Sequence, residues 1–300
     1  MSVRRIFVSI GLCFSLSVLP FCRVCLADEP RRISIVTSFY PAYIMALNVA
    51  AAIPGVSVEN LAAVSGCLHD YALTVQDMKK ISGADIFVVN GAGLEIYLQE
   101  IMRANKQLKI IELSRGLPLI EHNGRVNPHL WVSISDAILQ VRNLEKMLES
   151  LDPLRAEQYR KNADTYVARL EELKERMHAS LDQYRGESIV TFHEAFPYFA
   201  QEFGFRVVAV IEREPGSQPS ARELAETIDA IRKNKVRVIF SEPQYPAAAA
   251  HLIANETDAE VYALDPAVSG PFDCNAYCQI MEKNLSVLKQ AFSETRVPQE

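Results

Sequence analysis

Residues 153–184 read PLRAEQYRKNADTYVARLEELKERMHASLDQY and contain no glycine and no proline after the first residue. Pro153 suits the first turn of a helix, Gly186 lies just past its end, and the apolar residues from Leu170 to Leu181 keep helical spacing. Such a helix would be about 48 Å long at about 1.5 Å per residue, which is long for a helix inside one domain. We interpret it as a rigid rod joining two lobes. A coiled coil is the alternative, although the apolar repeat is short.

Short β-branched apolar runs alternate with amphipathic stretches on both sides of this helix. Two of the expected helices begin at capping-box pairs, Thr74 with Asp77 and Ser220 with Glu223. This rhythm predicts an α/β fold with largely parallel sheets flanked by helices. Strands are expected at ISIVT (33–37), VENLAAV (58–64), DIFVV (85–89), LKIIEL (108–113), SIVTF (188–192), RVVAVI (206–211), VRVIF (236–240) and EVYAL (260–264).

The N-terminal segment differs from the rest of the chain. Residues 1–27 have arginines at positions 4 and 5, continue with an apolar run to about Phe21 and close on Cys25-Leu26-Ala27. These features are typical of a cleaved secretory signal peptide and predict a periplasmic protein. An N-terminal membrane anchor is the alternative, but the run is short for a span. Neither Cys22 nor Cys25 follows the small residue that lipoprotein processing requires, so there is no clear lipobox.

The length of 300 residues exceeds what one core usually holds, so we expect separate domains. The predicted organisation is a signal peptide at 1–27, an N-terminal α/β lobe at 28–150, the interdomain helix at 151–186 and a C-terminal α/β lobe at 187–300.

Loss of the signal peptide changes the formal charge from −6 to −9, because that segment holds three arginines and no acid. An acidic protein is a poor partner for nucleic acid and a plausible one for cations. Three cysteines remain: Cys67, Cys274 and Cys278. They allow one disulfide at most, and Cys274 with Cys278 is the favoured pair if the backbone geometry permits it.

Polar residues that could bind a ligand follow several strands. In open parallel sheets, ligands bind beyond the carboxyl ends of the strands. His69, His193, Glu242 and Asp265 come shortly after expected strands, and His129 in NGRVNPHLWVS opens a helix after an Asn-Pro turn. Each has a structural alternative as a loop, cap, turn or core residue. Together they predict a metal site, because imidazole and carboxylate suit zinc, manganese or iron.

The remaining histidines and motifs are less informative. His122 is a weak outer-sphere candidate, His178 is expected to be solvated, and His251 is expected to pack in an alanine-rich helix. The sequence lacks H-E-x-x-H, G-x-S-x-G and a P-loop, and NGAGLEI lacks the third glycine of a dinucleotide fingerprint. A zinc hydrolase with Glu242 or Glu194 as general base stays open as an alternative.

Segments along the whole mature chain resemble one family in order. They are SFYPAYIMALNVA, HDYALTVQDMKKISGADIFVVNGAGLE, NPHLWVS, TFHEAFPYFAQEFGF, IFSEPQYP and YALDP. They are similar to the solute-binding proteins of zinc and manganese ABC importers, the ZnuA/TroA-like cluster A-I. The resemblance implies a non-enzymatic two-lobed receptor with its metal site in the cleft. It implies His69 and His129 as ligands from the first lobe and His193 and Asp265 from the second, with Trp131 packing behind His129.

The resemblance also implies the function. We expect a monomer that binds one divalent transition metal and delivers it to a membrane permease with a cytoplasmic ATPase. Three histidines and one aspartate favour Zn2+ over Mn2+, and His193 stands where manganese relatives commonly have glutamate. Affinity should fall as the pH drops through about 6.5, because protons compete for the imidazoles.

Three departures from the family pattern stand beside this interpretation. Leu68 replaces the usual proline, the preceding Cys67 could pack near the site or bind the metal, and the long histidine-rich loop of many zinc-specific members is missing. An adhesin or a metal chaperone without an importer is the further alternative.

Overall fold

The computed structural model describes residues 31–61, 71–122, 124–212 and 219–295. The strands are β1 (Ile33–Thr37), β2 (Val56–Asn60), β3 (Ile86–Val89), β4 (Lys109–Glu112), β5 (Glu121–His122), β6 (Arg125–Val126), β7 (Ser188–Thr191), β8 (Arg206–Val210), β9 (Val238–Ser241) and β10 (Glu260–Ala263). The helices are α1 (Tyr40–Ala50), α2 (Val75–Ser82), α3 (Leu98–Ala104), α4 (Ile134–Leu151), α5 (Ala156–Leu181), α6 (Pro197–Phe203), α7 (Ala221–Asn234), α8 (Ala248–Asn255) and α9 (Ala276–Thr295).

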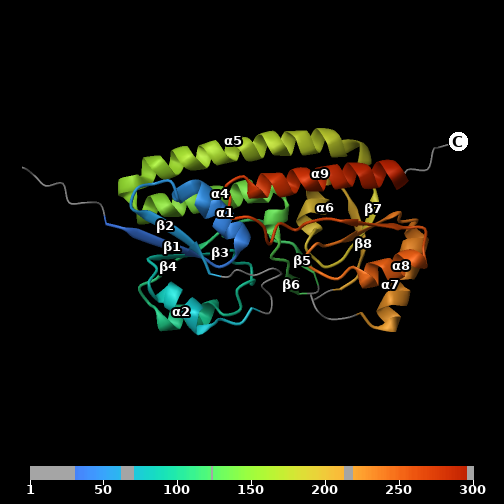
Figure 1. The fold of residues 1–300 in the computed structure, drawn as a ribbon, viewed down its shortest axis with the longest axis horizontal. Coiled ribbons are helices and arrows are strands. Elements are labelled where there is room, and N and C mark those ends of the chain that lie inside the picture. Colours follow the sequence, from blue (N-terminus) through green and yellow to red (C-terminus); the bar gives the residue numbers. More distant parts are fainter. Residues whose placement is uncertain (1–30, 62–70, 123, 213–218, 296–300) are drawn as a thin grey trace, which may run out of the picture. The chain divides into compact units, whose positions relative to one another are not determined.

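The strands form two separate four-stranded sheets, as Figure 1 shows. The first has the order β2-β1-β3-β4 and the second the order β10-β9-β7-β8, and all pairs within both are parallel. β5 and β6 make a small antiparallel hairpin. The predicted α/β class with parallel sheets flanked by helices is confirmed.

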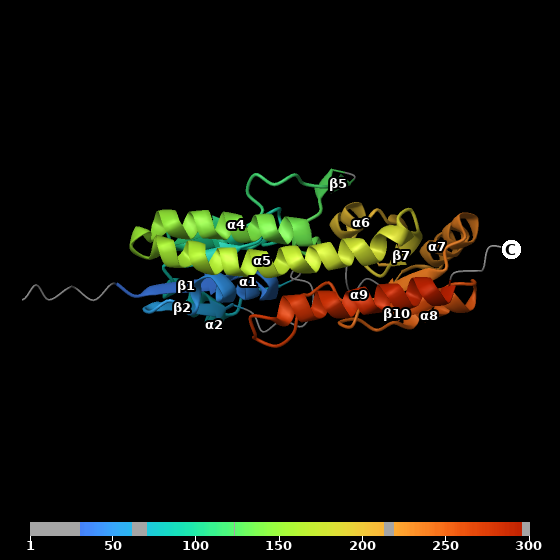
Figure 2. The same ribbon diagram turned by 90° about the horizontal axis from the view of Figure 1, so that it is seen from above.

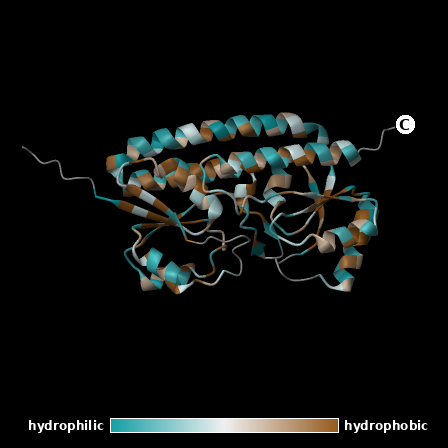
Figure 3. Cartoon of the chain, viewed as in Figure 1, coloured by the Kyte–Doolittle hydropathy of each residue, from teal (hydrophilic) through white to brown (hydrophobic). Residues whose placement is uncertain are grey.

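The central strands of each sheet are buried on both faces, which explains why β3 and β9 are almost entirely apolar, whereas the edge strands carry exposed residues. Along β3, Ile86 and Val88 belong to one core cluster while Phe87 and Val89 belong to another. β7 and β9 alternate in the same way between two clusters. This follows from the two-residue period of a strand whose two faces are both covered by helices. Figure 3 shows the resulting concentration of hydrophobic residues in the strands.

The long helix expected over residues 153–184 is present as α5, but it is shorter at both ends. It has 26 residues and therefore spans about 39 Å. The residues at its two ends, Pro153–Arg155 and Asp182–Tyr184, form single 3-10 turns. Arg155 has φ −112°, outside the helical range, so the α-helix begins only at Ala156.

α4 and α9 run beside α5 (Figure 2). α9 also contacts β9 and β10 of the second sheet and α1, which lies against the first sheet. No helix is predicted from the sequence for residues 276–295, where the structure has α9. The predicted domain boundaries stay a prediction, because the signal-peptide segment lies outside the described residues.

The helices and the cysteine thiols also bear on the predictions for membrane anchoring and disulfide formation. Within the described part of the chain, no helix is both long and apolar enough to cross a bilayer. Cys274 and Cys278 are both free thiols, the first exposed and the second half-buried, so the favoured disulfide is not formed here. Cys67 lies outside the described residues.

Candidate metal centre

The ring of His129 is held by the residue at the start of its own turn. His129 donates its backbone N–H and its Nδ1–H to Asn127 Oδ1, both at 3.0 Å. The Asn127 amide is itself oriented, because Nδ2 donates to the Glu194 carbonyl oxygen at 2.7 Å. Tyr198 from α6 donates to the Asn127 carbonyl oxygen at 2.8 Å. Since Asn127 Oδ1 can only accept, Nδ1 carries the proton and Nε2 presents its lone pair.

His193 lies in the loop between β7 and α6 and has an equivalent anchor. Its Nδ1 is 2.5 Å from Glu242 Oε1, and its backbone N–H donates to the same oxygen at 3.2 Å. Glu242 follows β9, the neighbour of β7, and its side chain is completely buried. A carboxylate on Nδ1 fixes the tautomer of an imidazole and makes its Nε2 a better metal ligand. Glu242 therefore accepts a backbone hydrogen bond and also contacts the His193 ring.

The structure brings these two rings together. His129 Nε2 lies 3.4 Å from His193 Nε2, and the ring planes meet at 74°. Both residues are 2% exposed. Two nitrogens bound to one tetrahedral zinc at 2.0–2.1 Å would be about 3.3–3.4 Å apart. With both protons placed on Nδ1, the pair has the spacing of two ligands on one edge of such a site.

Asp265 lies just beyond β10, at the same edge of the second sheet as His193 and Glu242. Its Oδ1 accepts hydrogen bonds from Gln244 Nε2 at 3.0 Å and from the Ala267 N–H at 2.9 Å. No group of three or more His, Cys, Asp or Glu side chains surrounds one point among the described residues. His69 lies outside the described residues, so the four-residue ligand set stays a prediction.

The NGAGLEI segment serves the site as a backbone support. Glu95 accepts hydrogen bonds from Ser38 Oγ at 2.7 Å and from the N–H groups of Asn90 and Gly91 at 2.8 and 3.0 Å. Burial raises the pKa of the Glu95 carboxyl, and these hydrogen bonds oppose the shift. Asn90 Nδ2 then donates to the Pro128 carbonyl oxygen at 2.9 Å, directly before His129. Gly91 has φ +77°, and a Cβ at this position would lie 2.6 Å from the Ser114 hydroxyl oxygen.

The other histidines lie elsewhere. His122 is exposed on β5. His178, which we expected to be solvated, is partly exposed, with Nε2 3.3 Å from Glu202 and its ring 4.7 Å from that of Phe203. His251 is exposed on α8, and the expectation that it packs inside is wrong, because only Ala250 and Ile253 of that helix are buried.

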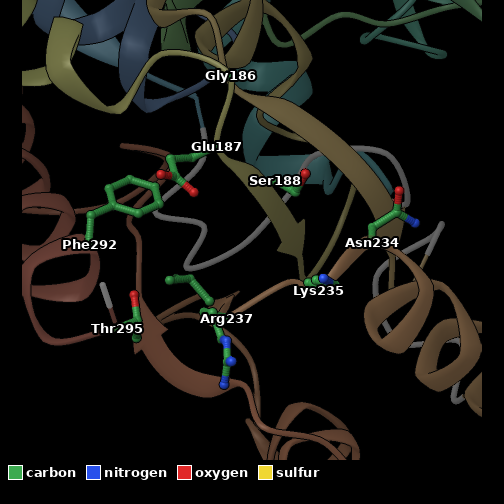
Figure 4. Close-up of a pocket in the computed structure, with 9 residues that line it drawn as sticks. Gly186, Glu187, Ser188, Asn234, Lys235, Arg237, Phe292 and Thr295 are labelled. Carbon is green, nitrogen blue, oxygen red and sulfur yellow. The ribbon is translucent and has the colours of Figure 1, made fainter. Parts of the chain in front are cut away.

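A cavity of about 120 Å³ lies at the opposite edge of the second sheet, where β7 and β9 begin (Figure 4). Its lining includes Glu187, Asn234, Lys235, Arg237 and Phe292 and contains no histidine or cysteine. Imidazole and thiolate are the preferred transition-metal ligands. The cavity is therefore separate from the candidate metal centre at the carboxyl ends of the strands.

Comparison with known proteins places this geometry in context. A family model described as zinc-uptake complex component A, periplasmic, matches residues 35–291. The chain is 30% identical over 280 residues to the zinc-binding lipoprotein AdcA of Streptococcus pneumoniae, covering 86% of this chain and 56% of AdcA. It is 30% identical over 241 residues to the iron-binding protein YfeA of Yersinia pestis, covering 78% and 77%. The chain thus spans about half the length of the AdcA protein that it matches.

A solved structure of the solute-binding protein FpvC from P. aeruginosa, in complex with Ni2+, has a TM-score of 0.81 to this chain. The two are 30% identical, and the alignment covers 90% of this chain and 100% of FpvC.

Proposed function

Since the chain belongs to the ZnuA family of divalent-metal-binding solute-binding proteins, we propose that it captures zinc outside the cytoplasm and delivers it to the permease of an ABC importer. The family is not enzymatic. Of the two carboxylates considered as the general base of a hydrolase, Glu242 is engaged with the His193 ring. Delivery to a permease with a cytoplasmic ATPase, the periplasmic location and the monomeric state belong to the proposal.

One observation supports the proposed site most strongly. His129 follows the strands of the first sheet and His193 follows β7 of the second, yet their Nε2 atoms lie 3.4 Å apart with both Nδ1 atoms anchored. Because the fold already orders both buried rings, metal binding loses little side-chain conformational entropy, which favours high affinity. We propose His69 and Asp265 as the remaining ligands, by their match to the family motifs.

Zinc is the proposed metal, with manganese as the second choice. Three imidazoles and one carboxylate form a set that suits tetrahedral zinc, and the 3.4 Å nitrogen spacing fits that geometry. The names of the relatives differ in metal: AdcA is called zinc-binding, YfeA iron-binding, and FpvC was solved with nickel. We therefore base the choice of zinc on the ligand residues of this chain.

Metal content of the full chain, expressed in a bacterial host and purified without chelator, tests the proposal. We expect one equivalent of zinc in the unaltered protein and a large loss of affinity in His129→Ala. His251→Ala is the matched control, because His251 is an exposed histidine on α8. One equivalent of manganese or iron would refute the zinc choice but keep the receptor. An absence of bound metal and of affinity for all three ions would refute the function.

A further inference from the structure

We propose that Asn284 and Trp131 are positioning residues that set the place of Asp265 relative to His129. The inference rests on the proposed function, in which both of the latter residues bind the metal. Neither Asn284 nor Trp131 would contact the ion. Each would act by holding the backbone that carries a ligand.

Asn284 grips the backbone of Asp265 from α9. Its Oδ1 accepts the Asp265 N–H at 2.9 Å, and its Nδ2 donates to the Asp265 carbonyl oxygen at 2.7 Å. The side chain is 1% exposed. A buried amide with both polar atoms bonded to one residue leaves that residue little freedom to rotate or slide. Asp265 therefore enters the site from a fixed backbone position.

Trp131 connects the same segment to the turn that carries His129. Its Nε1–H donates to the Pro266 carbonyl oxygen at 2.8 Å, one residue after Asp265. Its ring packs on the His129 ring with centroids 5.3 Å apart. Tyr277 on α9 donates to the Trp131 carbonyl oxygen at 2.7 Å. One helix, α9, thus holds the turn of His129 through Tyr277 and the backbone of Asp265 through Asn284.

The turn that follows Asp265 contains a residue in an unfavourable backbone conformation. Ala267 has φ +59°, a left-handed conformation that costs free energy for a residue with a Cβ. In this turn the Ala267 N–H donates to Asp265 Oδ1 at 2.9 Å. Without the hydrogen bonds from Asn284 and Trp131, the segment would relax, and the Asp265 carboxylate would move with it.

A general contribution to stability is the competing explanation for these hydrogen bonds. That explanation predicts that loss of Asn284 weakens the fold whatever residue stands at 265. A positioning role predicts that Asn284 affects zinc affinity only while the Asp265 carboxylate is present. A double-mutant cycle separates the two, because coupling between residues appears as non-additivity.

The experiment measures zinc affinity by competition with a chromogenic chelator in the unaltered full chain, Asn284→Leu, Asp265→Ala and the double variant. We expect Asn284→Leu to weaken binding by about 10- to 100-fold when Asp265 is present, the range for outer-shell partners of metal ligands. In the Asp265→Ala background the same change should alter affinity by less than about threefold. Chemical denaturation of the metal-free proteins reports folding separately.

Milder and matched variants accompany the cycle. Asn284→Ala removes both hydrogen bonds with a smaller side chain beside the Asp265 backbone, so it serves if Asn284→Leu does not fold. Trp131→Phe keeps a ring against His129 and loses the N–H donor. Both should show the same dependence on Asp265. Asn162→Leu is the control, because this α5 residue donates only to the Val49 carbonyl oxygen, at 3.1 Å, and should leave affinity unchanged.

Equal losses of affinity from Asn284→Leu in both backgrounds would overturn the positioning role while leaving the metal site intact. If Asp265→Ala itself left zinc affinity unchanged, Asp265 would not be a ligand, and the positioning role would fail with it. Loss of zinc binding in His129→Ala would still support the receptor function in that case, so the two failures can be distinguished.

Discussion

Replacement of Glu242 is the most informative single change near the two rings. Its Oε1 accepts both the Nδ1–H and the backbone N–H of His193. Glu242→Gln keeps an acceptor oxygen in the same place but removes the charge. Glu242→Ala removes the acceptor for both donors inside a site where the side chain is completely buried. The two changes therefore separate the charge of the carboxylate from its geometry.

The structure predicts that Glu242→Ala weakens metal binding more than Glu242→Gln does. Outer-shell partners of ligating histidines are worth about 10- to 100-fold in metal affinity, or roughly 1.4–2.7 kcal/mol. Glu242→Gln should fall near the lower limit, because the ring stays oriented. Glu242→Ala should fall near the upper limit, because the His193 ring can then rotate and a buried N–H loses its partner.

Competition titration with zinc gives the affinities, and thermal unfolding of the metal-free proteins shows whether the fold is retained. Glu194→Gln is the control, since the neighbouring Glu194 contributes its backbone carbonyl oxygen to Asn127. The reasoning is refuted if Glu242→Ala and the control have the same affinity, or if the glutamine variant is weaker than the alanine variant.

Two further predictions concern stability. Burial alone would raise the pKa of Asp77, but hydrogen bonds from Thr74 and Tyr71 outweigh it and hold that pKa below its ordinary value. The carboxylate thus stabilises the fold above about pH 4 and less as the pH falls through its lowered pKa. Asp77→Asn should therefore cost about 1 kcal/mol at pH 7, and urea unfolding should show this cost decreasing as the pH is lowered below about 4. A cost that stays constant as the pH is lowered would contradict this. Glu202 accepts the Ser135 hydroxyl and N–H at the start of α4, so Glu202→Ala should lower the free energy of unfolding by about 1–3 kcal/mol, and a loss below about 0.5 kcal/mol would count against this cap.

Local patterns were enough to predict much of the fold. The capping boxes at Thr74 and Ser220 mark the true starts of α2 and α7, because their side chains bond within three residues. The eight strands of the two sheets lie where apolar β-branched runs indicated, within one or a few residues at their ends. α9 is harder to predict, because Asn284 interrupts its apolar stripe at the point where it binds Asp265. A tertiary contact thus obscures the helical period.

The candidate site could be predicted only in part. Strand ends indicated His193, Glu242 and Asp265, since parallel strands bring their carboxyl ends to one edge. The hydrogen-bond partners of the two imidazole rings differ in their sequence separation from the histidine. Asn127 lies two residues before His129, so that contact is local, whereas Glu242 and His193 are 49 residues apart and meet only because β7 and β9 are neighbours. No spacing in the sequence carries that information.

The contacts around α9 also determine when the site can form during folding. The hydrogen bond from Trp131 to Pro266 joins residues 135 apart in the sequence, and the bond from Tyr277 to Trp131 joins residues 146 apart. Contacts of such separation form slowly, because long loops must close before they contribute stability. The backbone of Asp265 is fixed only after one of the last helices of the chain has docked. A partly synthesised or unfolded chain therefore has the histidines but lacks the long-range hydrogen bonds that position them. Metal capture thus becomes a property of the completed fold.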